Sequence, residues 1–394
     1  MPAASPSTAR AINDRLALRL LQHEGPLTAG QLKQLTGLSR PTVADLVERL
    51  TDAGLITVVG EAGEQRRGPN ARLYGIVADR AHLAALDVRT EGVSVAVSDL
   101  VGTVLAEASV PIGDDTGTGP AVERAVALVE RAVKEAGADR LHTVGIGAPG
   151  LIDPASGELR DSSGLPQWHR GLVATLQERF PEARVSVENE TNLAALAEQR
   201  DGAARDRGTF VLLWLGHGTG AAVVLDGALR RGASGGTGEI GFLPVPGTTG
   251  LPSATDCAGG FHSLAGSAAI TRLAAEHGFA AGEAHAPAAA RLVAEAAAHA
   301  GEARLFLDAL ADRIALGVAS VVAVLDPGCA VLGGEVGQAG GPLLAALVEE
   351  RVRRMSPLPV AVRPSTLGGT AVLRGALLTA RDRAQEVLFA PPGR

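Results

Sequence analysis

Two short amphipathic segments joined by a tight turn constrain the N-terminal part of this chain more than any other feature. Thr28 begins the first segment, in which Leu32 and Leu35 are expected to face inward. The run Thr36-Gly37-Leu38 follows at once. Because a glycine in such a run readily adopts a left-handed backbone, the spacing predicts that the first helix ends there.

The second segment carries both a start signal and an inward-facing stripe. Ser39 is a favourable N-cap residue, and Pro41 suits the first turn of a helix. The apolar residues that follow recur at positions i, i+3, i+4 and i+7, as on one face of a helix: Val43, Leu46, Val47 and Leu50. Two short helices with a glycine turn between them predict a helix-turn-helix.

A hairpin after the second helix defines the subtype. Residues 55–59 and 71–76 are rich in β-formers, and the loop between them carries Arg66 and Arg67. A hairpin in this place is the wing of a winged helix, and its arginines suit the minor groove or phosphates. We therefore expect a DNA-binding unit over residues 10–80, after a disordered tail at residues 1–9. A small bundle that mediates protein contacts is the alternative.

The expected DNA contacts lie at the starts of the two helices, on the face of the second helix opposite its apolar stripe, and on the wing. Arg40 suits guanine or phosphate. Asp45 either accepts a hydrogen bond from cytosine or pairs on the helix surface. The full set of expected contacts is Thr28, Ser39, Arg40, Thr42, Arg49, Arg66 and Arg67.

Charge and composition narrow the class of protein. The formal net charge is −7, but the first 80 residues carry ten Lys and Arg against eight Asp and Glu. A basic-leaning head on an acidic body is compatible with local DNA contact. The two cysteines, Cys257 and Cys329, fit a reducing cytoplasm and not a disulfide scaffold. No apolar run is long enough to span a membrane, so we expect a cytoplasmic protein.

From His82 onward, strand-like segments alternate with helical ones. Residues 83–88, 93–98 and 143–147 predict strands, and residues 121–136 predict a helix. Such alternation is typical of α/β architecture, in which ligands bind at strand ends. Residues 281–300 are nearly all alanine and predict a packed helix.

Five segments stand in order along the chain: residues 145–153 (GIGAPGLID), 165–168 (LPQW), 187–198 (VENETNLAALAE), 238–242 (GEIGF) and 331–334 (VLGG). Together they resemble the ROK family of repressors, open reading frames and sugar kinases. The resemblance covers almost the whole chain, and ROK repressors carry an N-terminal winged helix. It implies an actin-like, two-lobed ATPase-type fold with a sugar cleft between the lobes.

The resemblance also implies domain limits. The first lobe is expected over residues 81–190, completed by a C-terminal helix at 370–390. The second lobe, over residues 191–369, is expected to hold the effector cleft and the oligomer interface. ROK regulators are usually homo-oligomers, so a homodimer or homotetramer is expected.

Compared with the kinases of this family, this chain has altered phosphate-binding loops and an altered catalytic base. Kinases carry Asp-x-Gly-Gly-Thr where this chain has residues 87–91 (DVRTE), so both glycines are absent and Glu91 adds negative charge. A second loop, Gly-Thr-Gly in the kinases, is Gly216-His217-Gly218 here. The catalytic Asp is replaced by Glu190, and a displacement on the order of 1 Å can cost a hundredfold in rate. We therefore expect no catalytic residues and no cofactor.

The zinc site of the family is altered as well. The histidine position is Phe242, and residues 255–262 (TDCAGGFH) replace a loop with three cysteines. Because a structural zinc site needs four sulfur or nitrogen ligands, no metal is expected. Phe242 and Phe261 at two ligand positions indicate that a hydrophobic plug replaces the zinc.

The sugar-binding positions are better retained. The family binds sugar hydroxyls through residues that match Asn189, Glu190 and Glu239, and His262 and His217 are further candidates. Carboxylates and amides suit vicinal hydroxyls because they donate or accept in pairs. Gly164 stands where kinases usually carry a sugar-binding Asn, so the hydroxyl preference is not carried over.

The resulting hypothesis is a repressor of sugar or amino-sugar utilisation genes that binds double-stranded operator DNA. A sugar or sugar-phosphate effector in the altered body would control it. An active ATP-dependent sugar kinase with a fused DNA-binding head is the first alternative. A constitutive DNA-binding protein whose body only oligomerises is the second.

Overall fold

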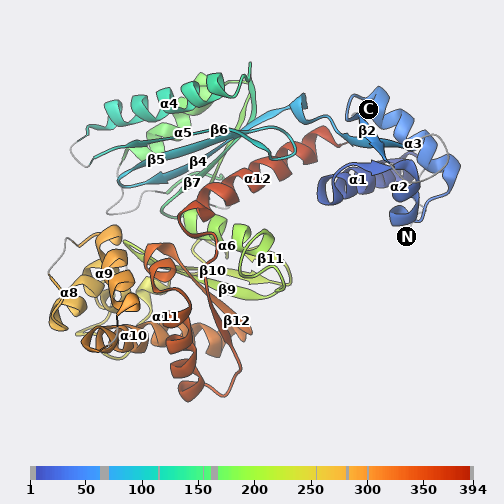
Figure 1. The fold of residues 1–394 in the computed structure, drawn as a ribbon. Coiled ribbons are helices and arrows are strands. Elements are labelled where there is room, and N and C mark those ends of the chain that lie inside the picture. Colours follow the sequence, from blue (N-terminus) through green and yellow to red (C-terminus); the bar gives the residue numbers. More distant parts are fainter. Residues whose placement is uncertain are drawn as a thin grey trace.

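The computed structural model describes residues 6–62, 71–113, 116–153, 155–160, 167–253, 255–280, 284–299 and 301–390. Figure 1 shows a small N-terminal unit, which we call the head, beside a body of two lobes. Helix α12 (Ala371–Leu388) runs from the junction of the lobes toward the head (Figure 1). In the described part of the chain, no helix is both long and apolar enough to cross a membrane.

The head is a winged helix, as predicted. Its sheet has the antiparallel order β1-β3-β2. The elements are α1 (Pro6–Glu24), β1 (Leu27–Thr28), α2 (Ala29–Thr36), α3 (Arg40–Asp52), β2 (Ile56–Ala62) and β3 (Ala71–Ile76). Helix α1 begins at Pro6, so residues 6–9 are helical and do not belong to the tail expected over residues 1–9.

Local signals account for the helix boundaries of the head. Thr28 caps α2 in a reciprocal capping box with Gln31, and Gly37 ends α2 with φ of 70°. The α3 stripe from Val43 to Leu50 is buried as predicted. The inward placement of Leu35 was wrong, because its side chain is 50% exposed and α2 contributes Leu32 to the head core instead.

The N-lobe contains a five-stranded sheet of order β6-β5-β4-β7-β8. Its strands are β4 (His82–Arg89), β5 (Gly92–Ser98), β6 (Val104–Pro111), β7 (Leu141–Ala148) and β8 (Arg184–Asn189), and β4, β7 and β8 are parallel. Side chains alternate along β4: Ala84 and Leu86 pack with α4 (Thr118–Glu135) and α5 (Trp168–Arg179), whereas Leu83 and Ala85 belong to the core that includes α12. A short η1 turn (Ala78–Arg80) links the head to β4.

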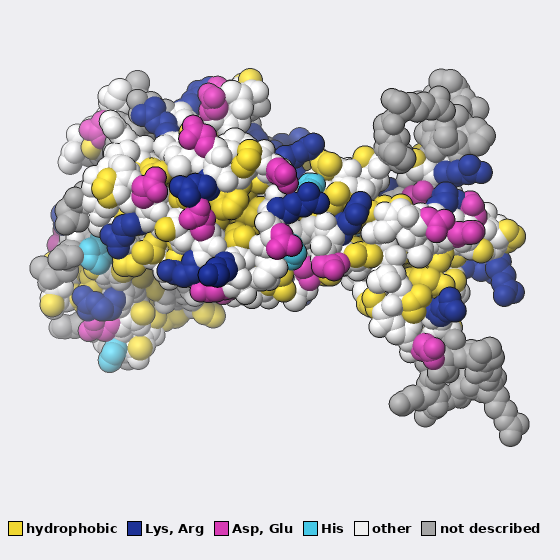
Figure 2. All heavy atoms as spheres, turned by 90° about the horizontal axis from the view of Figure 1, so that it is seen from above, with side chains coloured by type: hydrophobic (Ala, Val, Ile, Leu, Met, Phe, Trp, Pro, Cys, Tyr) yellow, Lys and Arg dark blue, Asp and Glu magenta, His cyan; other side chains and the backbone are white. Residues whose placement is uncertain are grey.

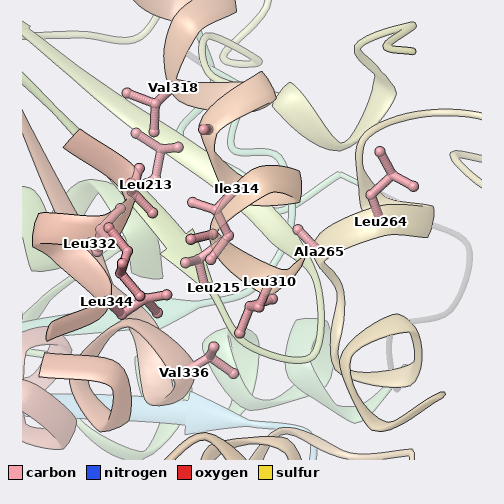
Figure 3. Packing of buried hydrophobic residues seen from close by; sticks show 14 of the residues in the cluster. Leu213, Leu215, Leu264, Ala265, Leu310, Ile314, Val318, Leu332, Val336 and Leu344 are labelled. Atoms are coloured by element: carbon pink, nitrogen blue, oxygen red, sulfur yellow. The ribbon is translucent and has the colours of Figure 1, made fainter. Parts of the chain in front are cut away.

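The C-lobe repeats the plan with a sheet of order β11-β10-β9-β12-β13. Its strands are β9 (Phe210–Leu215), β10 (Thr219–Leu225), β11 (Ala228–Arg230), β12 (Cys329–Gly333) and β13 (Ala361–Pro364). Its helices and turns are α6 (Glu190–Arg200), η2 (Ile240–Phe242), α7 (His262–Ala265), α8 (Ser267–Glu276), α9 (Ala286–Ala298), α10 (Glu302–Leu325), α11 (Gly334–Met355) and η3 (Gly368–Thr370). Leu213, Ile314 and Leu332 point toward one another in the core of this lobe (Figure 3).

Helix α12 lies in close contact with the N-lobe sheet at Gly145 of β7. A Cβ atom at Gly145 would lie 2.7 Å from the carbonyl oxygen of Ala376 on α12. Real Cβ atoms do not approach oxygen so closely, so a glycine is required here and the helix backbone rests directly on the strand.

The far end of α12 reaches the head. Gln385 Nε2 donates to Gln22 Oε1 of α1 at 2.7 Å and to the carbonyl oxygen of Leu100 at 3.0 Å. Gln22 Nε2 in turn donates to the carbonyl oxygen of Val101 at 3.0 Å. The head is thus attached to both the last helix and the β5–β6 turn of the N-lobe.

Candidate functional site

The start of α3 presents the residues that were expected to contact DNA. Ser39 is the N-cap: its Oγ accepts from the backbone amide of Thr42 at 3.3 Å and lies 2.8 Å from Thr42 Oγ1. The Thr28 hydroxyl is likewise engaged in the cap of α2. The Ser39 and Thr28 hydroxyls therefore cap the starts of α3 and α2, and the positive end of a helix dipole favours an anion such as phosphate.

The arginines of the head differ in their surroundings. Arg40 is exposed and forms no ion pair with any residue that the structure describes. Arg49, in contrast, pairs with Asp14 of α1 at 2.6 Å and with Asp45 on its own helix. Figure 2 shows Lys and Arg side chains along the outer end of the head, mixed with acidic ones. Arg66 and Arg67 lie outside the described residues.

Asn189 stands where β8 passes into α6, at the junction of the lobes. Its Oδ1 accepts from the backbone amides of Thr191 at 2.9 Å and Asn192 at 3.2 Å, so it caps α6. Its Nδ2 donates to the Gly150 carbonyl at 3.1 Å and to Glu190 Oε2 at 2.8 Å. All four hydrogen-bonding positions of the amide are engaged within the protein, so Asn189 positions Glu190.

Glu190 and Glu239 come together in space although 48 residues separate them in sequence. Burial raises the pKa of Glu190 to about 8, and the charges of Asp87 and Glu239 add to the effect. The Glu239 side chain reaches solvent, yet the surrounding protein removes enough water to raise its pKa as well. At neutral pH Glu190 is therefore largely protonated and can donate a hydrogen bond.

The raised pKa of Glu190 predicts a pH-dependent effect of Glu190→Gln. Since the folded-state pKa of about 8 exceeds the ordinary value of 4.5, the wild type loses stability as pH rises between those values. Gln cannot ionise, so the variant should be more stable than the wild type at pH 8 by up to about 4 kcal/mol, and not at pH 4.5. Urea unfolding of both chains across this range measures the difference, with the exposed Glu178→Gln as control. A difference that is the same at both pH values contradicts the prediction.

His217 and His262 lie close enough to interact. Burial lowers the pKa of His262, and the proximity of His217 lowers it further. His262 also packs beside Gly241, two residues after Glu239. The structure therefore places both histidines on the Glu239 side of the junction.

The altered zinc loop is only partly a hydrophobic plug. Phe261 is fully buried and packs against Gly317, where an added Cβ would lie 2.5 Å from the ring. Phe242 is 37% exposed, so its expected role as a plug was wrong. No group of three or more His, Cys, Asp or Glu side chains among the described residues is arranged to hold a metal.

An ion-pair network that the sequence analysis missed joins the two lobes. Arg89, at the end of β4, contacts Asp87 Oδ2 at 2.9 Å and Glu335 Oε1 of α11 at 2.6 Å. It also donates to the carbonyl oxygen of Gly369, just before α12, at 3.2 Å. Because Arg89 and Glu335 lie 246 positions apart, no local pattern could have paired them.

The arrangement defines a class of protein: a winged helix joined to a two-lobed, actin-like body. The family model described as "ROK family" matches residues 83–383, and the model described as "MarR family" matches residues 12–68. The chain belongs to the ROK family.

Curated relatives are similar over part of their length. A "Xylose repressor" of Caldicellulosiruptor bescii is 27% identical over 59% of this chain and 59% of its own. The "DNA-binding transcriptional dual regulator NagC" of Escherichia coli is 28% identical over 59% of this chain and 57% of its own. The matches thus span less than two thirds of these relatives.

Solved structures share the fold. A ROK transcriptional regulator titled as a homologue of the E. coli MLC protein superposes with a TM-score of 0.76 and 22% identity, covering 97% of this chain and 98% of its own. A ROK glucokinase from Streptomyces griseus, in complex with glucose and AMPPNP, gives a TM-score of 0.64 and 26% identity. It covers 76% of this chain and 99% of its own, and so resembles the body.

Proposed function

We propose that this protein is a DNA-binding transcription regulator, a repressor of sugar utilisation genes, and that a sugar or sugar-phosphate effector controls it. The effector binds between the lobes, at the site formed by Glu190, Glu239, His217 and His262. The observation that carries the proposal is the course of α12. It starts beside the Gly369 carbonyl that accepts from Arg89, and Gln385 near its end contacts the head. With 18 residues, this helix is about 27 Å long.

This link supplies the physical requirement for control. Effector and operator must prefer different arrangements of the protein, and each then weakens the binding of the other by the same factor. A change in the lobe junction moves the start of α12, and a rigid helix carries the displacement to the head. One winged helix buries too little surface for tight specific binding, so the regulator acts as a homodimer or homotetramer on double-stranded DNA.

Within the head, we assign DNA contact to the start of α3. Arg40 is exposed there and free of ion pairs with described residues, whereas Arg49 is held by two carboxylates. Ser39, Thr28 and Thr42 lie at the starts of α3 and α2, where the helix dipole favours phosphate, and Arg66 and Arg67 of the wing complete the proposed surface. Asp45 pairs with Arg49, which supports its placement on the helix surface.

The test measures binding to the DNA upstream of the protein's own gene, with and without a panel of sugars and sugar phosphates. Arg40→Ala should weaken DNA binding about tenfold, as expected for one lost arginine contact, and leave effector binding unchanged. Glu239→Ala should bind DNA normally and lose the effector response. Lys134→Ala, exposed on α4, is the control. If no compound changes DNA affinity or the melting temperature of the wild type, the proposal fails.

A sugar kinase is the second candidate, and one observation favours it. Glu190, with a pKa of about 8, has the proton affinity of a general base that works near neutral pH. Against it stands the Arg89–Glu335 pair, which fills the junction with fixed charges. Turnover in a coupled assay with ATP and hexose on the order of 1–100 per second would establish the kinase.

A further inference from the structure

Three segments from both lobes meet around the carboxylate of Glu335. Its Oε1 pairs with Arg89 of the N-lobe at 2.6 Å. Its Oε2 lies against Gly216, where an added Cβ would be only 2.6 Å away. Glu335 itself belongs to the first turn of α11, where the backbone amides favour a negative charge. An arginine, a glycine loop and a helix start together form an anion-binding site.

The protein's own Glu335 carboxylate occupies this anion-binding site. The Glu335 carboxylate forms an ion pair with Arg89, the cation that an incoming phosphate would need. The Glu335 side chain is only 21% exposed. Burial raises the pKa of Glu335, and the charge of Arg89 opposes that rise. Among the described residues, Arg89 is the only cation that acts on the pKa of Glu335, and it already pairs with Asp87, so a second anion would meet the Glu335 charge there.

The rest of the site calls for a ligand that donates hydrogen bonds. Asp87 is 4% exposed, and its Oδ1 is buried without a hydrogen-bond partner. The Oγ1 atom of Thr219, which borders the Gly241 turn, is buried and unpartnered too. A carboxylate oxygen only accepts, so its missing partner is a donor such as a sugar hydroxyl, and the phosphate group of a ligand cannot take that position.

We propose that Glu335, held by Arg89, is a resident anion that excludes phosphate from the interlobe site, so that the effector is an uncharged sugar. The inference rests on the proposed function and narrows its ligand class. Removal of the carboxylate frees the Arg89 Nη1 that pairs with it, together with the start of α11, to receive an external phosphate group.

The first experiment needs no sugar. Binding of pyrophosphate is measured by calorimetry and thermal shift for the wild type, Glu335→Ala, Glu335→Gln and the control Glu350→Ala, which removes an exposed carboxylate from the same helix. Wild type and control should show no saturable binding. Glu335→Ala should show saturable binding, with half-saturation at least about tenfold below the highest pyrophosphate concentration at which the wild type shows none, as expected for a charge-assisted pair regained by Arg89. Glu335→Gln, which keeps the side-chain shape, should show the same gain if the alanine variant does not fold. Saturable binding to the wild type, or no gain in either folded variant, overturns the proposal.

The second experiment uses matched sugar pairs on the wild-type chain bound to its upstream DNA. The pairs are D-glucose with glucose 6-phosphate, N-acetyl-D-glucosamine with its 6-phosphate, and D-xylose with xylose 5-phosphate. The uncharged member should act at a lower concentration in every pair that has an effect. A phosphorylated member that acts at the lower concentration overturns this inference and leaves the proposed function intact. Inactivity of all six compounds in the DNA and melting assays counts against the proposed function, whereas the pyrophosphate result stands apart from it.

Discussion

Replacement of Glu198 by alanine should lower the free energy of unfolding by about 3–5 kcal/mol, because several neutral hydrogen-bond donors lose one buried acceptor. Glu198 lies on α6 and is fully buried. Its carboxylate accepts from the amide of Ala203 at 2.6 Å, from Ser365 Oγ at 2.5 Å, and from the amides of Thr366 and Leu367, both at 3.1 Å. Alanine leaves these donors without a partner, and each buried unpaired amide costs about 1–3 kcal/mol before water or rearrangement offsets it.

Chemical denaturation followed by circular dichroism measures the Glu198 effect. Glu198→Gln should be affected less than the alanine variant, because it keeps the side-chain volume and one acceptor oxygen. Glu178→Ala, exposed on α5, is the matched control and should stay within about 0.5 kcal/mol of the wild type. An alanine variant at position 198 that unfolds at the same urea concentration as this control contradicts the prediction.

Gly375→Ala should destabilise the protein by about 1–3 kcal/mol, the usual cost of overpacking. A Cβ at this position of α12 would lie 2.0 Å from the Leu193 carbonyl oxygen and 2.5 Å from its carbon, both on the backbone of α6. A backbone atom cannot rotate away as a side chain does, so the two helices must separate. The usual effect of the same substitution in a helix is the opposite, a gain of up to about 1 kcal/mol.

That opposite sign provides the control. Gly119 lies in the first turn of α4, is exposed, and has no atom within 4 Å of an added Cβ. Gly119→Ala should therefore leave the melting temperature unchanged or raise it, while Gly375→Ala lowers it. If Gly375→Ala leaves the melting temperature unchanged or raises it as Gly119→Ala does, helix propensity and not the α6–α12 contact governs position 375.

The sequence predicted the elements that local chemistry determines. Ser39, Gly37 and the α3 stripe act within one turn of helix, so their pattern was sufficient to place the winged helix. Leu35 was misplaced because periodicity states that two leucines share a face but not whether a neighbour covers that face. The same limit applies to Phe242: its residue type indicated a plug, and only the surrounding chain determines that it reaches solvent.

The site was predictable where its residues act locally or follow the family pattern. The family motif that contains Asn189 was sufficient to place this residue at the site. Its role as an N-cap with every hydrogen bond engaged became visible only from the three-dimensional contacts. Arg89 was interpreted as a missing glycine. Its partner Glu335 directly follows the retained Gly333-Gly334 and drew no attention, because complementary charges on two distant loops carry no signal in a single sequence.

The contacts that α12 makes through Gly145 and Gly375 have a mechanical consequence. Where helices meet through long side chains, rotamer changes absorb small displacements, and the motion fades within one layer of atoms. Here the backbone of α12 contacts the backbone of β7 on one side and of α6 on the other, so rotamer changes cannot absorb a displacement. A shift of a few tenths of an ångström at β7 or α6 is therefore transmitted to α12, which moves as a rigid body with these elements.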